Sequence, residues 1–296
     1  MRAAVWHLRV FLGMGLVFAA LSELWFYPIS GIVGLFELTL YYAVAAHVGL
    51  LVMMRLGAGG WLGFYLAAAF LGFVIEAVPV FEFFSAMPMT IVWTSMAWHG
   101  LVSGVLGIWM FRAAAARGLW WFVGYAALFG GFLGLWAGYY WSVEPEGLRF
   151  GEQLPWAFGM FALGHVLIPA ARSWQGADRW VMWIGGAVIA FFFAVAGLWM
   201  FFPLSLALPV MVGLTFFAGR GVVSNAPLWA DIPVSRFWVL LIVPVFAVAV
   251  YDLSEGTAWI SELNALVFLI AGPVSVGLLA WCLWRAIKKG RPTSAL

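Results

Sequence analysis

Ionisable side chains within long apolar runs are the residues of this sequence most able to do chemistry. Glu76 and His99 are the central pair, and Ser95 and Ser103 stand four residues before and after His99. Residues four apart lie on one face of a helix, so the two hydroxyls and the imidazole would form one polar stripe. A carboxylate beside an imidazole can exchange a proton as a site fills and empties, which makes these four residues a candidate substrate or ion site.

The two apolar runs that hold this pair are joined by a short connection, around Ser85 to Pro88. Helices joined so tightly are antiparallel neighbours. We therefore predict that Glu76 and His99 lie within hydrogen-bond reach of each other, directly or through one water. We also expect them to face a cavity that opens outward.

Further side chains could contribute to the same site or to a second one. Glu37 and Tyr41 share a helical face in the preceding run, and we expect them to join the binding site. The secondary candidates are other ionisable residues within or near the ends of apolar runs: Glu23, Glu82, His165 and His47.

Three functional interpretations compete with a structural one. The pair could form the protonatable site of a transporter or permease for a small solute or ion. Glu37, Glu76 and His99 could instead bind a divalent metal in an intramembrane hydrolase, or His99 and His165 could ligate haem in a redox or pigment protein. Alternatively, Glu76 and His99 only neutralise each other and join two helices of an accessory subunit.

Several motifs that would favour an enzyme are missing from the sequence. It contains no HExxH or HxxxH pair, no paired Glu-Glu motif of the CAAX-type intramembrane proteases, and no GxxxxGK[ST] or GxGxxG loop. Its only lysines, Lys288 and Lys289, are in the C-terminal tail, which excludes a retinal Schiff base within a helix. We therefore favour a transporter, predict no resident cofactor, and keep a divalent metal or haem as alternatives.

The composition indicates the solvent that surrounds these residues. The chain of 296 residues is 66% hydrophobic and only 9% charged, and its mean hydropathy is +1.06. Such a chain is a polytopic membrane protein, which excludes a disordered, secreted or nucleic-acid-binding protein. Membrane lipid is its main partner, and a homo-oligomer or a larger membrane complex is compatible with the sequence. The single Cys282 allows no intramolecular disulfide.

The elements that must position the candidate site are membrane-spanning helices. A bilayer core about 30 Å thick requires roughly 20 apolar residues in each helix. Charges, prolines and glycine clusters divide the chain into about ten such spans, which predicts an all-α fold. The predicted spans are 6–27, 31–54, 60–84, 88–111, 119–141, 155–171, 180–202, 204–219, 236–251 and 262–285.

The charges predict how these spans are oriented. Of the 14 Lys and Arg residues, all except Arg149 fall on one side of the predicted membrane, in connections or at the ends of the spans. Of the 12 acidic residues, only Asp178 and Asp231 fall on that side. Because basic loops stay in the cytoplasm, we predict that both termini are cytoplasmic. The expected location is the bacterial inner membrane, with the segment from Glu144 to Glu152 exposed outside.

Two patterns concern the packing of the helices. Residues 24–30 resemble residues 198–205, and ten spans could divide into the halves 1–141 and 155–285, so an internal duplication is an alternative to a single undivided domain. Glycines at four-residue spacing predict a seam where the span 119–141 packs closely against another helix: Gly130, Gly134 and Gly138.

Overall fold

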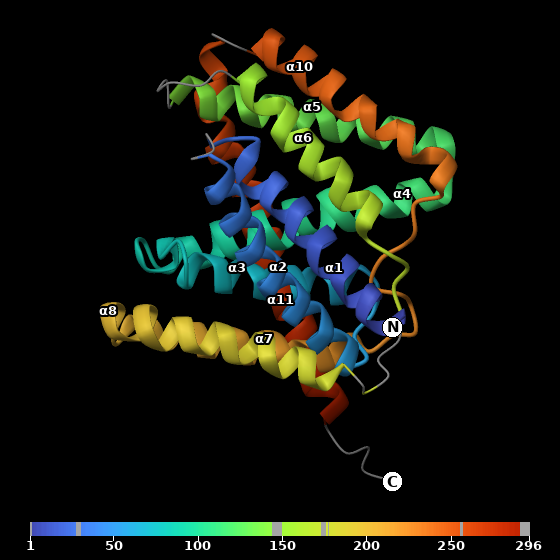
Figure 1. Ribbon diagram of the computed structural model, residues 1–296. Helices are drawn as coiled ribbons and strands as arrows, with labels where there is room; N and C mark the ends of the chain where they lie inside the picture. Colours follow the sequence, from blue (N-terminus) through green and yellow to red (C-terminus); the bar gives the residue numbers. More distant parts are fainter. Residues whose placement is uncertain are drawn as a thin grey trace. The chain divides into compact units, whose positions relative to one another are not determined.

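The computed structural model is helical (Figure 1). It describes residues 2–27, 31–143, 150–172, 176, 178–254 and 257–290. Among these residues no β-strand forms, and one isolated β-bridge joins Ala58 to Val223. The predicted all-α class is therefore confirmed, whereas Glu144, Glu146 and Arg149 lie outside the described residues.

Three kinds of helix make up the fold. The α-helices are α1 (Arg2–Ala19), α2 (Ile32–Arg55), α3 (Gly60–Ala77), α4 (Phe111–Arg117), α5 (Leu119–Val143), α6 (Phe150–Leu167), α7 (Arg179–Phe192), α8 (Trp199–Phe201), α9 (Ala207–Gly219), α10 (Ile242–Ser254) and α11 (Leu263–Gly290). The π-helices are η1 (Ala20–Leu24), η3 (Ile91–Met110) and η4 (Phe193–Leu198). The 3-10 helices are η2 (Glu82–Phe84), η5 (Leu204–Leu206), η6 (Arg220–Val222), η7 (Val234–Leu241) and η8 (Ala258–Glu262).

Nine helices of the described chain are long and apolar enough to cross a membrane. They are Arg2–Leu24, Ile32–Arg55, Gly60–Ala77, Ile91–Arg117, Leu119–Trp141, Arg179–Phe201, Leu204–Val222, Val234–Ser254 and Trp259–Lys289. This supports an integral, multi-pass membrane protein. One predicted span, 155–171, has no counterpart among the nine, because the helix that forms there includes Glu152, Gln153 and His165.

That helix, α6, lies antiparallel beside α1 over most of its length (Figure 1). At one end the Gln153 amide donates to the Tyr27 carbonyl, with Nε2 and O 3.2 Å apart. At the other end the Arg9 guanidinium donates to the Leu167 carbonyl, with Nε and O 3.0 Å apart. α6 is thus as long as the helix it packs against, although its sequence is less apolar.

The chain divides into two compact units, each built from three stretches. Unit 1 comprises residues 1–43, 106–170 and 230–270, and unit 2 comprises residues 44–105, 171–229 and 271–296. Three helices, α2, η3 and α11, begin in one unit and end in the other. The predicted duplication into halves stays a prediction.

The predicted glycine seam lies within unit 1, between α5 and α10. A methyl group on Gly130 or Gly134 would lie only 2.4 or 2.2 Å from the carbonyl oxygen of Val243 or Ala247. The two backbones can approach this closely only because these positions lack a side chain. Gly130 lies opposite Val243 and Gly134 lies opposite Ala247, so the residue numbers rise in the same direction along both helices. α5 and α10 are therefore parallel neighbours.

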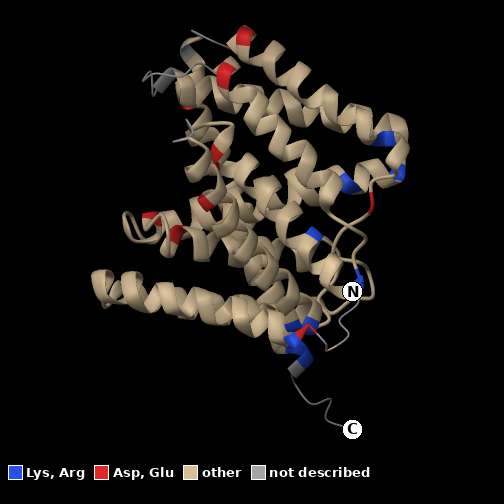
Figure 2. Cartoon of the chain, viewed as in Figure 1, with Lys and Arg blue, Asp and Glu red and all other residues tan. Residues whose placement is uncertain are grey.

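Charge is separated along the helices of unit 1 (Figure 2). Arg117 precedes α5 and Arg236 lies in η7, directly before α10, whereas Asp252 lies near the end of α10. The Arg236 guanidinium donates to the Ala115 carbonyl, so both arginines are at one end of the parallel pair. We call this the basic end of unit 1.

Unit 2 shows the same separation. α2 ends at Arg55 and α9 is followed by Arg220, and a methyl group on Gly219 would lie 2.8 Å from the Leu56 side chain. The two arginines therefore occupy one end of this unit, which we call the basic end of unit 2. Glu76 lies at the other end of α3.

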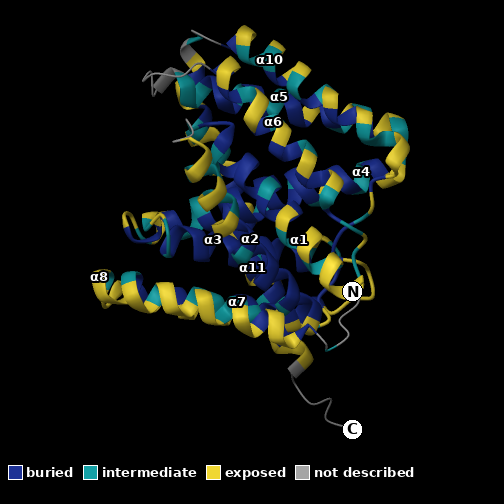
Figure 3. Ribbon diagram, viewed as in Figure 1, coloured by how far each residue is buried: buried dark blue, intermediate teal, exposed yellow. Residues whose placement is uncertain are grey.

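Burial distinguishes two helices of unit 2 (Figure 3). In α3, 83% of the most apolar window is buried, so this helix is surrounded by protein. In the helix Arg179–Phe201, which contains α7, 11% of the corresponding stretch is buried. Met182 is the only buried residue of α7 itself. α3 therefore positions the candidate site, and α7 is mostly exposed.

Candidate functional site

Glu76 and His99 meet inside unit 2, as the short connection between their helices predicts. The Nε2 atom of His99 lies 2.8 Å from Oε1 of Glu76. Their side chains are 2% and 8% exposed, respectively, so this is a buried pair. Glu76 comes from the C-terminal turn of α3 and His99 from the middle of η3.

Glycine allows the two helices to approach closely enough for this contact. A methyl group on Gly72, one turn before Glu76, would lie 2.4 Å from the Ser95 carbonyl oxygen and 2.9 Å from Cβ of His99. A methyl group on Gly104 would lie 2.4 Å from Cβ of Ala68. The missing side chains let η3 pack closely against α3 at Ala68 and Gly72, within the two turns that precede Glu76.

The helix that holds His99 has an unusual form. η3 is a π-helix of 20 residues, whereas π segments normally last one turn and occur often at functional sites. Ser95 and Ser103 lie on it, both fully buried. Within the part of the chain that the structure describes, the Ser95 hydroxyl has no hydrogen-bond partner. A buried polar atom without a partner costs free energy unless water or a ligand satisfies it.

The geometry of the pair permits three proton arrangements. His99 can be an imidazolium that donates from Nε2 to a carboxylate, or a neutral ring whose Nε2–H donates to the same oxygen. A protonated Glu76 can instead donate to the unprotonated Nε2 of a neutral ring. A second proton or a cation that occupies the carboxylate would compete with the imidazolium. The two side chains can therefore act as one proton-exchanging unit.

Glu37 and Tyr41 lie on the part of α2 that belongs to unit 1, and both are exposed there. Tyr41 is 42% exposed. That they join the site of Glu76, which belongs to unit 2, stays a prediction.

The secondary candidates have local partners. Glu23 accepts a hydrogen bond from Tyr42, with 2.6 Å between its Oε1 and the phenol oxygen. Glu82 is exposed and accepts from the Ser85 hydroxyl at 2.7 Å. His47 is buried in unit 2, with a side chain about as enclosed as that of Glu76.

His165, the other half of the haem interpretation, lies in unit 1. Its ring is fully buried between Phe111 and Phe161, at centroid distances of 4.9 and 4.6 Å. His99 belongs to unit 2. Each imidazole is thus enclosed by protein within its own unit.

The metal interpretation gains no support either. In the described ranges, no group of three or more His, Cys, Asp or Glu residues lies within reach of a common metal ion. Glu76 and His99 supply two ligands, fewer than the three protein ligands typical of a catalytic zinc site.

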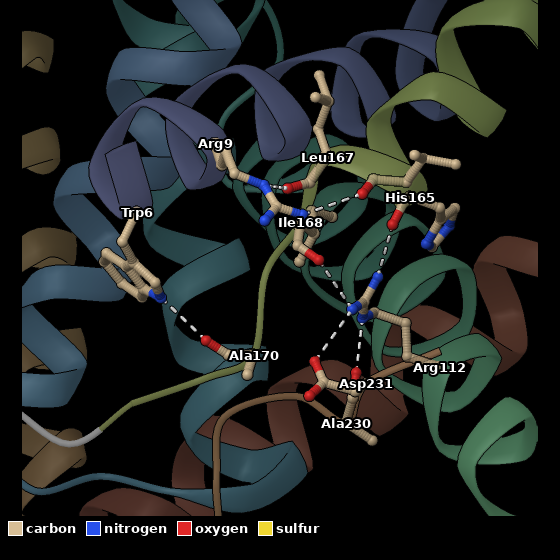
Figure 4. A network of polar contacts seen from close by, with 10 residues as sticks. Trp6, Arg9, Arg112, His165, Leu167, Ile168, Ala170, Ala230 and Asp231 are labelled. Carbon is tan, nitrogen blue, oxygen red and sulfur yellow. Dashed lines mark hydrogen bonds and ion pairs between the residues drawn. The ribbon is translucent and has the colours of Figure 1, made fainter. Parts of the chain in front are cut away.

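A second buried polar cluster, in unit 1, was not recognised from the sequence (Figure 4). Arg112 is 1% exposed. Its guanidinium donates to the carbonyls of Ala230, His165 and Ile168, at 2.7, 3.0 and 3.1 Å. Its Nη2 lies 3.7 Å from a carboxylate oxygen of Asp231.

This cluster supplies hydrogen-bond donors to the carbonyls at the C-terminal end of α6. The last four carbonyls of a helix have no partner within the helix. Arg112 binds two carbonyls at this end, Arg9 binds the Leu167 carbonyl, and the Trp6 indole donates to the Ala170 carbonyl at 2.9 Å (Figure 4). The cluster therefore fixes the ends of α1, α4 and α6 and the connection before η7.

One feature of the sequence could have indicated these arginine contacts. Asp178 and Asp231 are the two acidic residues predicted on the basic side, and each lies close to an arginine. Arg172 donates to Asp178 at 2.6 Å, and Arg112 lies near Asp231. An acidic residue among basic connections thus indicated an ion pair rather than a random loop charge.

Neither the buried pair nor the rest of the fold leads to a known relative. No protein-family model, curated protein or solved structure matches the chain.

Proposed function

We propose that this protein is a secondary transporter of a small solute or ion, coupled to proton exchange at Glu76 and His99. The observation that carries the proposal is the 2.8 Å contact between two ionisable side chains inside an apolar helical protein. An ionisable residue within a membrane span costs about 2.5–3.5 kcal/mol on insertion scales, so it is commonly retained for a function.

The neighbouring polar atoms support a site that can exchange a ligand. Ser95 presents a buried hydroxyl one turn from His99, and it has no partner among the residues described. This hydroxyl could bind a water or cation that also contacts Glu76. Loading the carboxylate would then remove the partner of the imidazolium and favour release of its proton.

The π-helix offers a means to open the site. Converting part of η3 from i→i+5 to i→i+4 hydrogen bonds would rotate and shift His99 relative to Glu76. Neither Glu76 nor His99 is among the lining residues of the two cavities described below.

Replacing Glu76 with Gln tests the coupling directly. The assay uses proteoliposomes that contain a pH-sensitive dye and receive a panel of added cations and small solutes. A potassium diffusion potential should drive proton entry through the wild-type protein when one of them is a substrate. Gln keeps the shape of Glu but cannot release a proton, so we expect Glu76→Gln to reduce the initial rate at least tenfold. Glu82→Gln, which removes an exposed carboxylate in the connection after α3, is the control and should retain the wild-type rate.

Two results would reject this function. One is wild-type proton entry through a folded Glu76→Gln protein. The other is a wild-type rate equal to that of protein-free liposomes in a panel of added cations and small solutes. A pH-difference infrared spectrum supplies a readout without any solute, because a protonated-carboxyl band should be lost in Glu76→Gln and kept in Glu82→Gln.

We further propose that the basic ends of both units face the cytoplasm, as positively charged connections generally do. α6 then forms a tenth crossing, because it runs beside α1 along its length. Cysteine labelling tests this after the buried Cys282 is replaced by Ala. We expect Arg117→Cys to react only from the cytoplasmic side and Trp259→Cys only from outside. Labelling of both from one side would contradict the arrangement.

A further inference from the structure

Unit 2 contains a cavity on the other side of α3 from the buried pair. Its volume is about 490 Å³, and its walls come from α2, α3, α7 with η4, and α9 with η6. On α3 it is lined by Phe70 and Val74, whereas neither Glu76 nor His99 lines it. The cavity is therefore separate from the proposed transport site.

The lining of this cavity is almost entirely apolar, with charge at one end only. Among its lining residues, Arg55 and Arg220 are the charged ones, and no hydroxyl or amide side chain is present. Both arginines are exposed at the basic end of unit 2. A sugar or amino acid would find no polar partner in the apolar part, where an unsatisfied polar group is costly.

The length of the cavity fits one leaflet of a membrane. Its lining on the α9 side runs from Leu208 to Arg220, about 18 Å at 1.5 Å per residue. Half of a hydrocarbon core of about 30 Å is about 15 Å. The apolar walls thus match the depth of one acyl chain, and the arginines match the level of its headgroup.

The wall formed by α7 gives such a chain a way in. Met182 is the only buried residue of α7, and a methyl group on Gly185 would lie 2.5 Å from the Val48 side chain. The helix touches α2 at this close point, while most of its residues are exposed (Figure 3). A lipid could therefore enter from the side of the protein.

We propose that this cavity binds an anionic membrane phospholipid, with one acyl chain in the apolar part and the phosphate between Arg55 and Arg220. Guanidinium groups bind phosphate oxygens through paired, charge-assisted hydrogen bonds. Anionic lipids also concentrate at basic patches on the cytoplasmic leaflet. The comparable cavity in unit 1, about 910 Å³, lacks a charged residue in its lining and so gives no such basis for a headgroup.

Native mass spectrometry with two added lipids tests the proposal. We expect the wild-type protein to bind one phosphatidylglycerol at least tenfold more tightly than phosphatidylcholine. The double variant Arg55→Gln/Arg220→Gln should bind both lipids equally. The control Arg179→Gln/Lys289→Gln removes two exposed charges that do not line the cavity, and it should keep the wild-type preference.

A second pair of variants tests the place where the acyl chain binds. Gly186 lines the cavity and has open space around its Cα. Gly186→Leu should therefore fill the cavity and weaken the binding of both lipids about tenfold. Gly213→Leu makes the same change on α9 at an equally open position outside the lining, and should bind like the wild type. Ala190→Leu, also in the lining, provides a second filling variant if Gly186→Leu does not fold.

Four outcomes would overturn the proposal. Three of them are equal wild-type affinity for the two lipids, a preference that survives loss of both arginines, and unchanged binding after the cavity is filled. Palmitate that displaces phosphatidylglycerol at lower concentration would assign the cavity to a free fatty acid and also overturn it. Because none of these residues belongs to the Glu76 site, failure here leaves the transport test unaffected.

Discussion

Replacing Arg112 with Ala is expected to lower the free energy of unfolding by roughly 3–5 kcal/mol, which is the range seen when one partner of a buried ionic cluster is removed. The physical reason is that three backbone carbonyls, those of Ala230, His165 and Ile168, lose their donor together. A buried acceptor without a partner retains its full desolvation cost. In a thermal unfolding assay in detergent, the midpoint should fall by on the order of 10 °C.

Arg117→Ala is the matched control for the loss of charge. Arg117 lies at the same basic end but is exposed, and its guanidinium lies over the Trp121 ring. Both variants remove one positive charge from the same connection, so both should affect topology equally. The unfolding midpoint of Arg112→Lys should lie between those of the wild type and Arg112→Ala, because an ammonium cannot reproduce the planar fork of donors. Equal midpoints for Arg112→Ala and Arg117→Ala would show that the cluster does not stabilise the fold.

The buried Glu76 and His99 should show strong coupling in a double-mutant cycle. His99→Phe leaves a carboxylate without its partner, and we expect a loss of about 3–5 kcal/mol in the free energy of unfolding. Glu76→Met leaves a neutral imidazole and should cost about 1–3 kcal/mol. The double variant replaces both groups by apolar ones of similar size, and should lie within about 1 kcal/mol of the wild type.

This cycle also separates a structural role from a functional one. If the pair only joined two helices, the stable double variant would keep every property of the protein. If the pair exchanges protons, the same variant should fold well and show no proton entry above that of protein-free liposomes. Additive effects of the two single substitutions would contradict the direct coupling between the side chains.

The sequence by itself determined the class of the protein and much of the buried pair. Apolar runs long enough to cross a membrane can satisfy their backbone groups there only as helices, so hydropathy predicts the all-α fold. A short connection makes the helices of Glu76 and His99 antiparallel neighbours, and both residues stand on faces marked by small or polar side chains. Local pattern and chain connectivity were therefore sufficient for this contact.

The tertiary structure alone decided which faces are buried. In a membrane span both the lipid-facing and the protein-facing sides are apolar, so hydropathy does not distinguish them. Glu37 and Tyr41 have the same four-residue spacing as the buried Ser95 and His99, but they lie on an exposed face of α2. The π form of η3 likewise has no marker in the periodicity, because it is a property of backbone hydrogen bonds.

Arg112 shows most clearly what only the tertiary structure could reveal. In the sequence it is one of many basic residues that the positive-inside rule places at a membrane surface. Its carbonyl partners are 53 to 118 residues away, on α6 and in the connection before η7. Carbonyls of the backbone are present at every residue, so no residue type identifies them as partners. Only the packing of α4 against α6 brings the unsatisfied end of a helix to this one side chain.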